Sequence, residues 1–341
     1  MVRVAVDVMG GDHAPAQILQ GCWQAGSLLD GADVVHLVGD EAVIRDGLDS
    51  SPLSPQQKQR FLIVPTTQVI GMDEPPVEAI RAKPDSSIAV MCKLAAKGEA
   101  DVVISAGNTG ACVAAAQLRM RLLPGVSRPG IAVILPTTHG QVVICDVGAN
   151  PEPKPQHLEQ YAFMAGAYAT AVCNVQNPRV GLLSIGEEDA KGNSMVKEAG
   201  KLLRDEPQIN FIGNVEGRDL FTGVCDVVVC DGFVGNIVLK FTEGMADGLF
   251  KLIAAELQEA APELVSQFAP VMKKIYGKHD WQEYGGAPLL GINGYCLICH
   301  GRSEARAIKN AIRVAKTLTA SKINDSIVQR IQASIAPSSA A

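Results

Sequence analysis

Residues 100–116, ADVVISAGNTGACVAAA, decide the fold of this chain. The stretch opens with apolar, β-branched residues typical of a buried strand and closes with alanines at helical density. The bend between them, residues 105–110, holds glycines and small hydroxyl and amide side chains but no acid, base or strong nucleophile. Glycine lets the backbone approach a ligand, and the start of a helix offers free N–H groups. We therefore expect a strand, a turn and a helix whose turn binds phosphate or another small anion.

The same unit recurs along the chain. The sequence predicts strands at residues 2–8, 33–38, 61–65, 101–105, 131–135, 141–146, 179–185, 209–212 and 226–230. It predicts helices near residues 14–30, 75–82, 85–97, 109–120, 155–173, 192–205, 235–257 and 303–320. Alternating elements of this kind predict a three-layer α/β/α fold with a mostly parallel, doubly wound mixed sheet. Most of the strands are apolar throughout, as burial on both faces requires.

Length and composition favour one large folded unit. The chain of 341 residues is 47% apolar and 19% charged, which supports a large core and argues against disorder. We expect a single domain over residues 1–335, with two intertwined subdomains as the alternative. Residues 258–300 mix prolines, glycine pairs and an amphipathic piece, so we expect an irregular region for dimer or membrane contact. Residues 336–341 are predicted to form a flexible tail.

Charge and cysteine content limit the partners and the cellular compartment that we expect for this protein. The formal net charge of −6 argues against nucleic acid as a partner, because phosphate backbones need a basic face. The odd number of cysteines, nine, scattered through apolar segments, is typical of reduced thiols in the cytoplasm. The first residues, MVRVAVDVMGGDHAP, predict a strand and a turn rather than a signal peptide. No apolar run reaches the roughly 18 residues that span a bilayer.

Candidate binding residues follow the predicted strands, because ligands bind beyond the carboxyl ends of strands in open α/β sheets. We expect several of these turns to share one rim and to form one anionic site. The candidates are Gly10, Gly11, Asp12, Gly107, Thr109, Gly110, Asn150, Lys154, Gly192, Asn193 and Asn236. The alternative is ordinary loop chemistry, in which Thr109 and Asp12 only cap helices.

Several familiar motifs are absent or unconvincing. No G-x-G-x-x-G follows the first strand, no P-loop occurs, and no G-x-S-x-G elbow is present, so a dinucleotide, a nucleoside triphosphate and a serine nucleophile are disfavoured. CLICH, residues 296–300, matches covalent haem attachment, but that chemistry belongs outside the cytosol. No second ligand pair stands at zinc spacing, and the cysteines lie in apolar runs that raise a thiol pKa. We expect no metal and no cofactor.

A family resemblance emerges from the combination of motifs. The chain resembles bacterial phosphate acyltransferases in AVDVMGGDHAP, ISAGNTGA, RPGIAVILPT, DVGANPEPKPQHLEQYA, GLLSIGEEDAKGN, FIGNVEGRDL, DVVVCDGFVGNIVLK, YGGAPLLGING and HGRS. The resemblance implies a fold related to phosphotransacetylases and to isocitrate and isopropylmalate dehydrogenases. It implies transfer of an acyl group from acyl carrier protein to inorganic phosphate, in a homodimer that serves phospholipid synthesis. The acyl phosphate would pass to a membrane-embedded acyl-phosphate:glycerol-3-phosphate acyltransferase.

Alternatives to this activity remain. A phosphotransacetylase-like enzyme would use acyl-coenzyme A in place of the carrier protein. A nicotinamide-dependent dehydrogenase on the related fold is disfavoured by the missing dinucleotide motif. A non-catalytic sensor of phosphate or acyl ligands belongs to a further class.

The chemistry needs no activated side chain, because phosphate dianion is itself the nucleophile that attacks the thioester. The enzyme must position phosphate, stabilise the oxyanion and exclude water. Candidates for these catalytic roles are His13, Asn108, Lys191, Asp231 and His300. The loops around Asn108 and Asn150 are expected to hold phosphate, with Lys154 or Lys191 neutralising its charge. His13 or His300 is expected to protonate the leaving thiolate or to donate to the oxyanion. Asp231 and Asn236 are expected to orient the pantetheine arm or a lysine.

Two basic surfaces are candidates for partners. Acyl carrier protein is acidic, so docking on this acidic chain needs a local basic patch. The residues Arg302, Arg306, Lys309 and Arg313 share one face of a predicted helix, which is otherwise a solvated face. Lys273 and Lys274 stand among apolar residues at helical spacing, which suits peripheral contact with the inner face of the cell membrane or a dimer element.

Overall fold

One continuous sheet of eleven strands runs through the computed structural model, which describes residues 1–279 and 281–335. In spatial order the strands are β3 (Phe61–Pro65), β2 (Val34–Gly39), β1 (Arg3–Asp7), β4 (Val102–Ser105), β11 (Tyr295–Ile298), β10 (Ala287–Leu290), β5 (Gly130–Thr137), β6 (Gly140–Cys145), β9 (Val227–Val229), β7 (Val180–Leu183) and β8 (Phe211–Val215). Each strand predicted from the sequence is confirmed to within a few residues.

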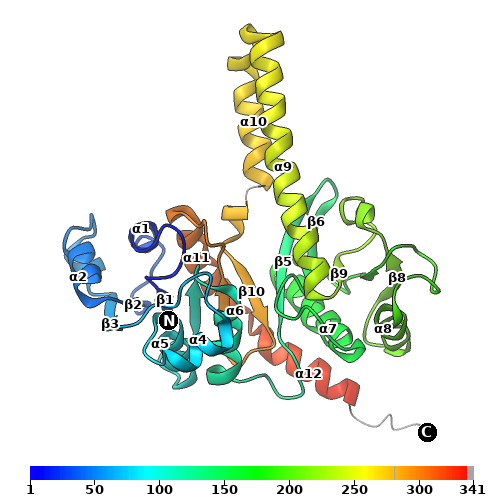
Figure 1. The fold of residues 1–341 in the computed structure, drawn as a ribbon, viewed down its shortest axis with the longest axis horizontal. Helices are drawn as coiled ribbons and strands as arrows, with labels where there is room; N and C mark the ends of the chain where they lie inside the picture. The colour runs from blue at the N-terminus through cyan, green and yellow to red at the C-terminus, as the bar shows by residue number, and fades with distance from the viewer. Residues whose placement is uncertain (280, 336–341) are drawn as a thin grey trace.

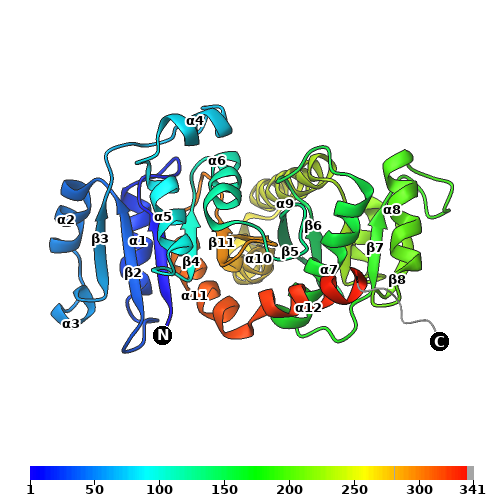
Figure 2. The same ribbon diagram turned by 90° about the horizontal axis from the view of Figure 1, so that it is seen from below.

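Helices cover both faces of the sheet (Figures 1 and 2). The helices are α1 (Ala16–Ala25), α2 (Glu41–Asp49), α3 (Pro55–Lys58), α4 (Pro76–Ala82), α5 (Ser87–Ala96), α6 (Thr109–Ala115), α7 (Pro155–Val172), α8 (Ser194–Asp205), α9 (Gly232–Ala260), α10 (Val265–His279), α11 (Ala305–Ser321) and α12 (Ile323–Ile335). One core packs α1, α7, α11 and α12 against the sheet, and a second packs α5 and α6 against the opposite face. The predicted three-layer α/β/α fold is confirmed.

The direction of the strands changes in the middle of the sheet. The pairings of β11 with β10, β10 with β5 and β5 with β6 are antiparallel, and the other pairings within the described residues are parallel. The carboxyl ends of β6, β9, β7 and β8 therefore lie at the opposite edge from those of β1, β4 and β11. Several candidate turns, those after β1, β4 and β11, share one edge as expected, but those after β6, β9 and β7 lie at the other edge, because a short hairpin at residues 137–140 turns the chain back.

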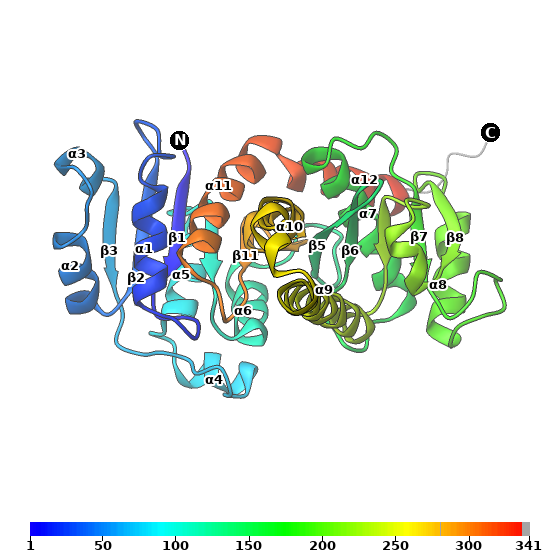
Figure 3. The same cartoon turned by 90° about the horizontal axis from the view of Figure 1, so that it is seen from above.

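A helical projection rises from the sheet. α9 is 29 residues long, and it packs with α10 as an antiparallel pair that stands clear of the body (Figure 1). Viewed from above, the pair lies over the middle of the sheet, where the two halves meet (Figure 3). Residues 258–300, expected to be irregular, thus contain the end of α9, α10, β10 and β11. No helix in the described part of the chain is long and apolar enough to cross a membrane.

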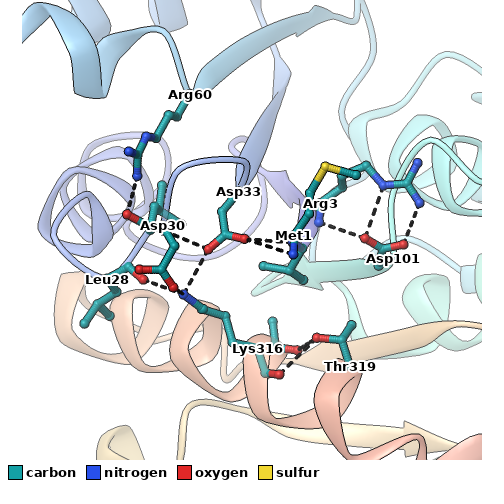
Figure 4. A network of polar contacts seen from close by, with 12 residues as sticks. Met1, Arg3, Leu28, Asp30, Asp33, Arg60, Asp101, Lys316 and Thr319 are labelled. Carbon is teal, nitrogen blue, oxygen red and sulfur yellow. Dashed lines mark hydrogen bonds and ion pairs between the residues drawn. The ribbon is translucent and has the colours of Figure 1, made fainter.

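Ion pairs connect the amino-terminal ends of β1 and β4 and hold α11 in place (Figure 4). Arg3 pairs with Asp101 at 2.6 Å and joins the starts of β1 and β4. Lys316 on α11 pairs with Asp30 at 2.6 Å and with Asp33 at 2.9 Å. These bonds hold α11 against the connection from α1 to β2, and so they fix the helix that follows the carboxyl end of β11. The tail predicted at residues 336–341 lies outside the described residues.

Candidate functional site

A pocket of about 410 Å³ lies where the loops after β1, β4 and β11 face α9 across β5. Its polar lining combines loop residues of the first half of the sheet with side chains of α9. The lining residues are Asp12, Met72, Thr109, Ile131, Val133, Ile134, Leu135, Pro136, Val147, Phe221, Asn236, Leu239, Lys240, Thr242, Glu243, Ala246, Gly286, Ala287, Ile298, Cys299, His300 and Gly301. The pocket is therefore bordered by both halves of the sheet.

Four of the residues singled out from the sequence meet in this pocket. Asp12 follows β1, Thr109 begins α6 after β4, His300 follows β11, and Asn236 lies in the first turns of α9. The first three come from neighbouring parallel strands, whose carboxyl ends share an edge. Asn236 reaches the same pocket because α9 starts at the opposite edge and runs back over the sheet.

His300 makes a short polar contact with α9. Its Nε2 atom lies 2.6 Å from Nζ of Lys240, and Lys240 is also 3.3 Å from a carboxylate oxygen of Glu243. The backbone N–H of Arg302 donates to Nδ1 of His300 at 3.1 Å. Burial, and then the charge of Lys240, lower the pKa of His300, so the imidazole is neutral at neutral pH.

Hydrogen bonds of Asn108 hold the turn at residues 105–110 to the start of α6 and to the loop before α4. The Asn108 side chain accepts from the N–H of Ala111 at 3.0 Å and donates to the carbonyls of Gly71, Met72 and Glu74 at 3.0–3.2 Å. Its amide thus caps α6 and fixes the loop before α4. Within the described residues, no oxygen accepts a hydrogen bond from the backbone N–H of Thr109 or of Gly110. Thr109 is exposed and lines the pocket.

Buried aspartates anchor the loops on the two halves. Asp7, at the end of β1, accepts from the Ser105 hydroxyl at 2.7 Å and from the N–H of Met9 at 3.1 Å. It thereby ties the β1 loop to the β4 loop. A side chain at Gly10 would place its Cβ 2.2 Å from the Asp7 carboxylate, so only glycine fits there. Burial raises the pKa of Asp7, and these hydrogen bonds oppose that shift.

Asp146 plays the corresponding part after β6. Its carboxylate accepts from the N–H groups of Ile131, Gly148, Ala149 and Asn150 at 2.7–3.1 Å. Burial raises the pKa of Asp146, and the backbone hydrogen bonds lower it.

The start of α9 docks on this loop. The N–H of Gly232 donates to the carbonyl of Asn150 at 2.9 Å, and a Cβ at Gly235 would lie 1.9 Å from the Asp146 carbonyl. Asp231 caps the helix by accepting from the N–H of Val234 at 2.8 Å. The Asn150 side chain donates to the carbonyl of Pro129 and to the Tyr161 hydroxyl. Asp231 and Asn150 therefore position α9 and, with it, Asn236 and Lys240.

The remaining predicted residues do not line the pocket. Lys154 and Asn193 are exposed positions before α7 and α8, and the Asn193 side chain caps α8. Lys191 is also exposed, and with Gly192 it follows β7, whose carboxyl end lies at the opposite edge. His13 is exposed beside the pocket residue Asp12. Gly10, Gly11, Gly107 and Gly110 shape the turns that carry Asp12 and Thr109.

Lys240 and Glu243 were missed by reasoning from the sequence. The signal was present, because Lys240 is one turn after Asn236 and ends the motif DVVVCDGFVGNIVLK. Asp7 and Asp146 were also missed, although each ends a strand and precedes valine and a glycine loop. Apolar runs that end in aspartate are the pattern that finds such anchors.

One cysteine, Cys299, lines the pocket. Cys92, Cys112, Cys296 and Cys299 are buried around β11. Burial raises the pKa of the Cys299 thiol to about 12, so it is protonated at neutral pH. Within residues 1–279 and 281–335, no group of three or more His, Cys, Asp or Glu side chains is placed to hold a metal ion.

Known proteins share both the sequence and the fold. Residues 2–326 match the family model described as "Fatty acid synthesis protein". A phosphate acyltransferase of Heliobacterium modesticaldum is 47% identical over 321 residues, which cover 92% of this chain and 93% of the relative. One from Desulfitobacterium hafniense is 48% identical over 318 residues, with 92% and 93% covered.

A solved structure extends the likeness to the fold. A phosphotransacetylase from Streptococcus pyogenes matches with a TM-score of 0.60 at 17% identity, covering 93% of this chain and 94% of that one. The sequence matches span nearly the whole chain and include every loop that borders the pocket. The chain therefore belongs to the phosphate acyltransferase family and is an acyltransferase.

Proposed function

We propose that this enzyme transfers a fatty acyl group from acyl-[acyl carrier protein] to inorganic phosphate and so forms acyl phosphate for phospholipid synthesis. The observation that carries the proposal is the pocket itself. It combines the Lys240–His300 pair, and N–H groups at Thr109 and Gly110 that have no acceptor within the described part of the chain, with an apolar wall. Lys240 and these donors suit phosphate, although Glu243 and Asp12 also line the pocket, and the apolar wall suits an acyl chain.

In this proposal, phosphate binds between Thr109 and Lys240. The N–H groups of Thr109 and Gly110 and the Thr109 hydroxyl donate to its oxygens, and Lys240 neutralises its charge. Holding the dianion beside the thioester contributes up to about 7–11 kcal/mol through positioning alone. Asn108 supports this arrangement by fixing the turn, so its expected role as a phosphate ligand becomes one of positioning. Lys240 takes the part that the sequence suggested for Lys191.

The leaving thiolate receives its proton from the His300–Lys240 pair. Nζ of Lys240 lies 2.6 Å from Nε2 of His300, so the pair can deliver a proton in the pocket where the thioester collapses. Asp12, at the mouth beside His13, and Asn236, on α9, are in place to orient the pantetheine arm. Tight positioning by rigid loops replaces a covalent intermediate.

The test compares two donors. Purified enzyme is mixed with labelled phosphate and either palmitoyl-carrier protein or palmitoyl-coenzyme A, and acyl phosphate is quantified. Faster formation per molar donor from the carrier supports the proposal. Equal or faster formation from coenzyme A supports the phosphotransacetylase-like alternative, and formation of NADH from a hydroxy acid would indicate a dehydrogenase.

The carrier is proposed to dock beside the pocket mouth. Arg302, predicted to share a helix face with the other three, instead lies exposed in the turn before α11, two residues after His300, and Lys309 lies on α11. Arg306 pairs with Glu283 at 3.1 Å, and Arg313 donates to the Glu283 carbonyl at 3.0 Å. Because these internal bonds compete with a partner, Arg302 and Lys309 are expected to contribute more to docking than Arg306 and Arg313.

The projection is proposed to join two copies and to touch the membrane. α9 exposes an apolar stripe that includes Phe241, Met245, Leu249 and Leu252, each more than half exposed. Two such stripes bury each other in a homodimer. On α10, Lys273 and Lys274 lie among the exposed Phe268, Val271 and Ile275, a combination that suits an anionic bilayer surface.

Each part of this surface proposal has its own test. Phe241→Asp with Leu249→Asp should convert dimers to monomers in analytical ultracentrifugation. Lys273→Glu with Lys274→Glu should reduce flotation with anionic liposomes, and unchanged flotation would remove the membrane role. Peripheral binding would bring the enzyme to the membrane-embedded acyltransferase that consumes its product.

A further inference from the structure

We propose that the groove between α9 and β5 is the acyl-chain site and that Ala246 and Phe221, at its far end, set the chain length accepted. The proposal deepens the function proposed above and rests on it. It concerns the apolar arm of the pocket, defined as Val133, Leu135, Pro136, Phe221, Leu239 and Ala246.

The groove has one helix wall and one strand wall. Asn236, Leu239, Glu243 and Ala246 recur at helical spacing and present one face of α9 to the pocket. Ten residues separate Asn236 from Ala246, a rise of about 15 Å along the helix. On β5, Ile131, Val133 and Leu135 point to the same face of the sheet, because side chains alternate along a strand. The two walls therefore run side by side for several turns.

The strand wall is incompletely covered. β5 pairs with β6 over residues 132–137, but with β10 only at Gly130 and Ile131. Val133, which lies beyond the pairing with β10 and on the same face as Leu239, is only half-buried. An aliphatic chain laid along β5 would remove this apolar surface from water.

Polarity changes along the groove in the direction that an acyl thioester requires. Lys240, His300 and Thr109 stand together at the reacting end. Beyond them, toward the root of the α9–α10 projection, the lining opposite α9 is apolar, with Leu135, Pro136 and Phe221, while Thr242 and Glu243 line the α9 side before Ala246. The carbonyl therefore lies against the donors, and the chain points along β5.

Two side chains define the far end. Ala246 is the last α9 residue that lines the pocket, and its small side chain leaves room for a chain. Phe221 ends the short helix at Gly217–Phe221, whose place is fixed by a bond from the Thr138 hydroxyl to the Phe221 carbonyl at 3.4 Å. A larger residue at 246 shortens the groove, and a smaller one at 221 opens it.

The experiment measures chain-length profiles. Wild type, Ala246→Phe and Phe221→Ala are assayed with carrier proteins that bear acyl chains graded in length from short to long. Ala254→Phe is the matched control, because Ala254 is an exposed residue two turns further along α9 and outside the pocket. Binding of the corresponding free fatty acids is measured by calorimetry on the same four proteins, so that the groove is tested without turnover.

Each outcome decides the proposal. Ala246→Phe should retain the shortest donors and lose the long ones, by about fourfold in affinity for each methylene excluded. Phe221→Ala should shift the optimum to longer chains, and Ala254→Phe should match wild type. An unchanged profile in both pocket variants, or an equal loss at all lengths, would overturn the proposal. If no donor reacts but fatty-acid binding shifts as stated, the proposed reaction fails while the groove stands.

Discussion

Each half of the sheet has a buried aspartate that accepts hydrogen bonds from nearby loops, but the two aspartates position different parts of the molecule. In the half that contains β1, Asp7 bonds across to Ser105 and joins two loops that border the pocket. In the half that contains β6, Asp146 gathers four backbone N–H groups of its own surroundings into a socket for α9. The first half therefore supplies pocket loops directly, and the second contributes mainly through the helix that it anchors. Functional groups meet although the strands of the two halves end at opposite edges.

The largest expected effect tests which half provides the cation. Lys240→Met should lower kcat by about 10²–10³, the typical cost of removing one donor from a developing charge. Lys191→Met should stay close to wild type, since Lys191 is exposed beside the other edge. Initial rates at limiting and saturating phosphate measure both. A large loss in Lys191→Met with a normal Lys240→Met would reverse the comparison.

A second prediction concerns the anchors. Asp146→Ala leaves four backbone donors without their acceptor, and each buried unsatisfied group costs about 1–3 kcal/mol, in part offset by relief of the buried charge. Asp7→Ala leaves fewer groups unpaired, so Asp146→Ala should lower the free energy of unfolding by more. Urea unfolding followed by circular dichroism gives both values. An equal or larger loss in Asp7→Ala would show that the two anchors do not differ as described.

A third prediction uses the pH dependence of His300. Burial and the charge of Lys240 hold its pKa below the usual value of about 6.5. The stability linked to neutral His300 is thus complete above the unfolded pKa and is lost as the pH falls through the lower folded pKa. Lys240→Met should raise the pKa of His300 in an NMR titration assigned with His300→Gln. Lys273→Met is the control, and no rise in Lys240→Met would contradict the short contact.

The smallest expected effect lies at the mouth of the pocket. Arg302→Glu should raise KM for the acyl-carrier protein a few-fold and leave kcat with acyl-coenzyme A unchanged, because exposed ion pairs contribute about 1 kcal/mol or less. Arg313→Glu should change KM less, because Arg313 already donates a hydrogen bond to the Glu283 carbonyl. Steady-state rates at low and high salt measure the difference. The docking proposal would lose its basis if both donors were affected alike.

The fold was accessible from the sequence because it depends on local patterns. The run DVVIS before SAGNTG and the alanines after it specify β4 and α6, and the same pattern recurs along the chain. The hairpin between β5 and β6 was not recognised, since TTHG lacks the usual Asn-Gly signal. That single hairpin reverses the strands beyond it, and it separates Lys191 and Asn193 from the pocket.

The site was only partly accessible for the same reason. Thr109, His300 and Asp12 follow strands that lie side by side, so the rule for strand ends placed them correctly within one pocket. Lys240 reaches the pocket through the direction of a long helix, which depends on how Gly235 packs against Asp146. The local periodicity of the sequence does not predict such long-range packing.

The central claim is that phosphate attacks the thioester directly, with no acyl-enzyme intermediate. Intact-protein mass spectrometry tests it most directly. The enzyme is incubated with palmitoyl-carrier protein in the absence of phosphate, and its mass is recorded before and after ¹⁸O-labelled phosphate is added. We predict an unchanged protein mass throughout and labelled acyl phosphate only after the addition. A protein heavier by one palmitoyl group, discharged when phosphate arrives, would contradict this mechanism.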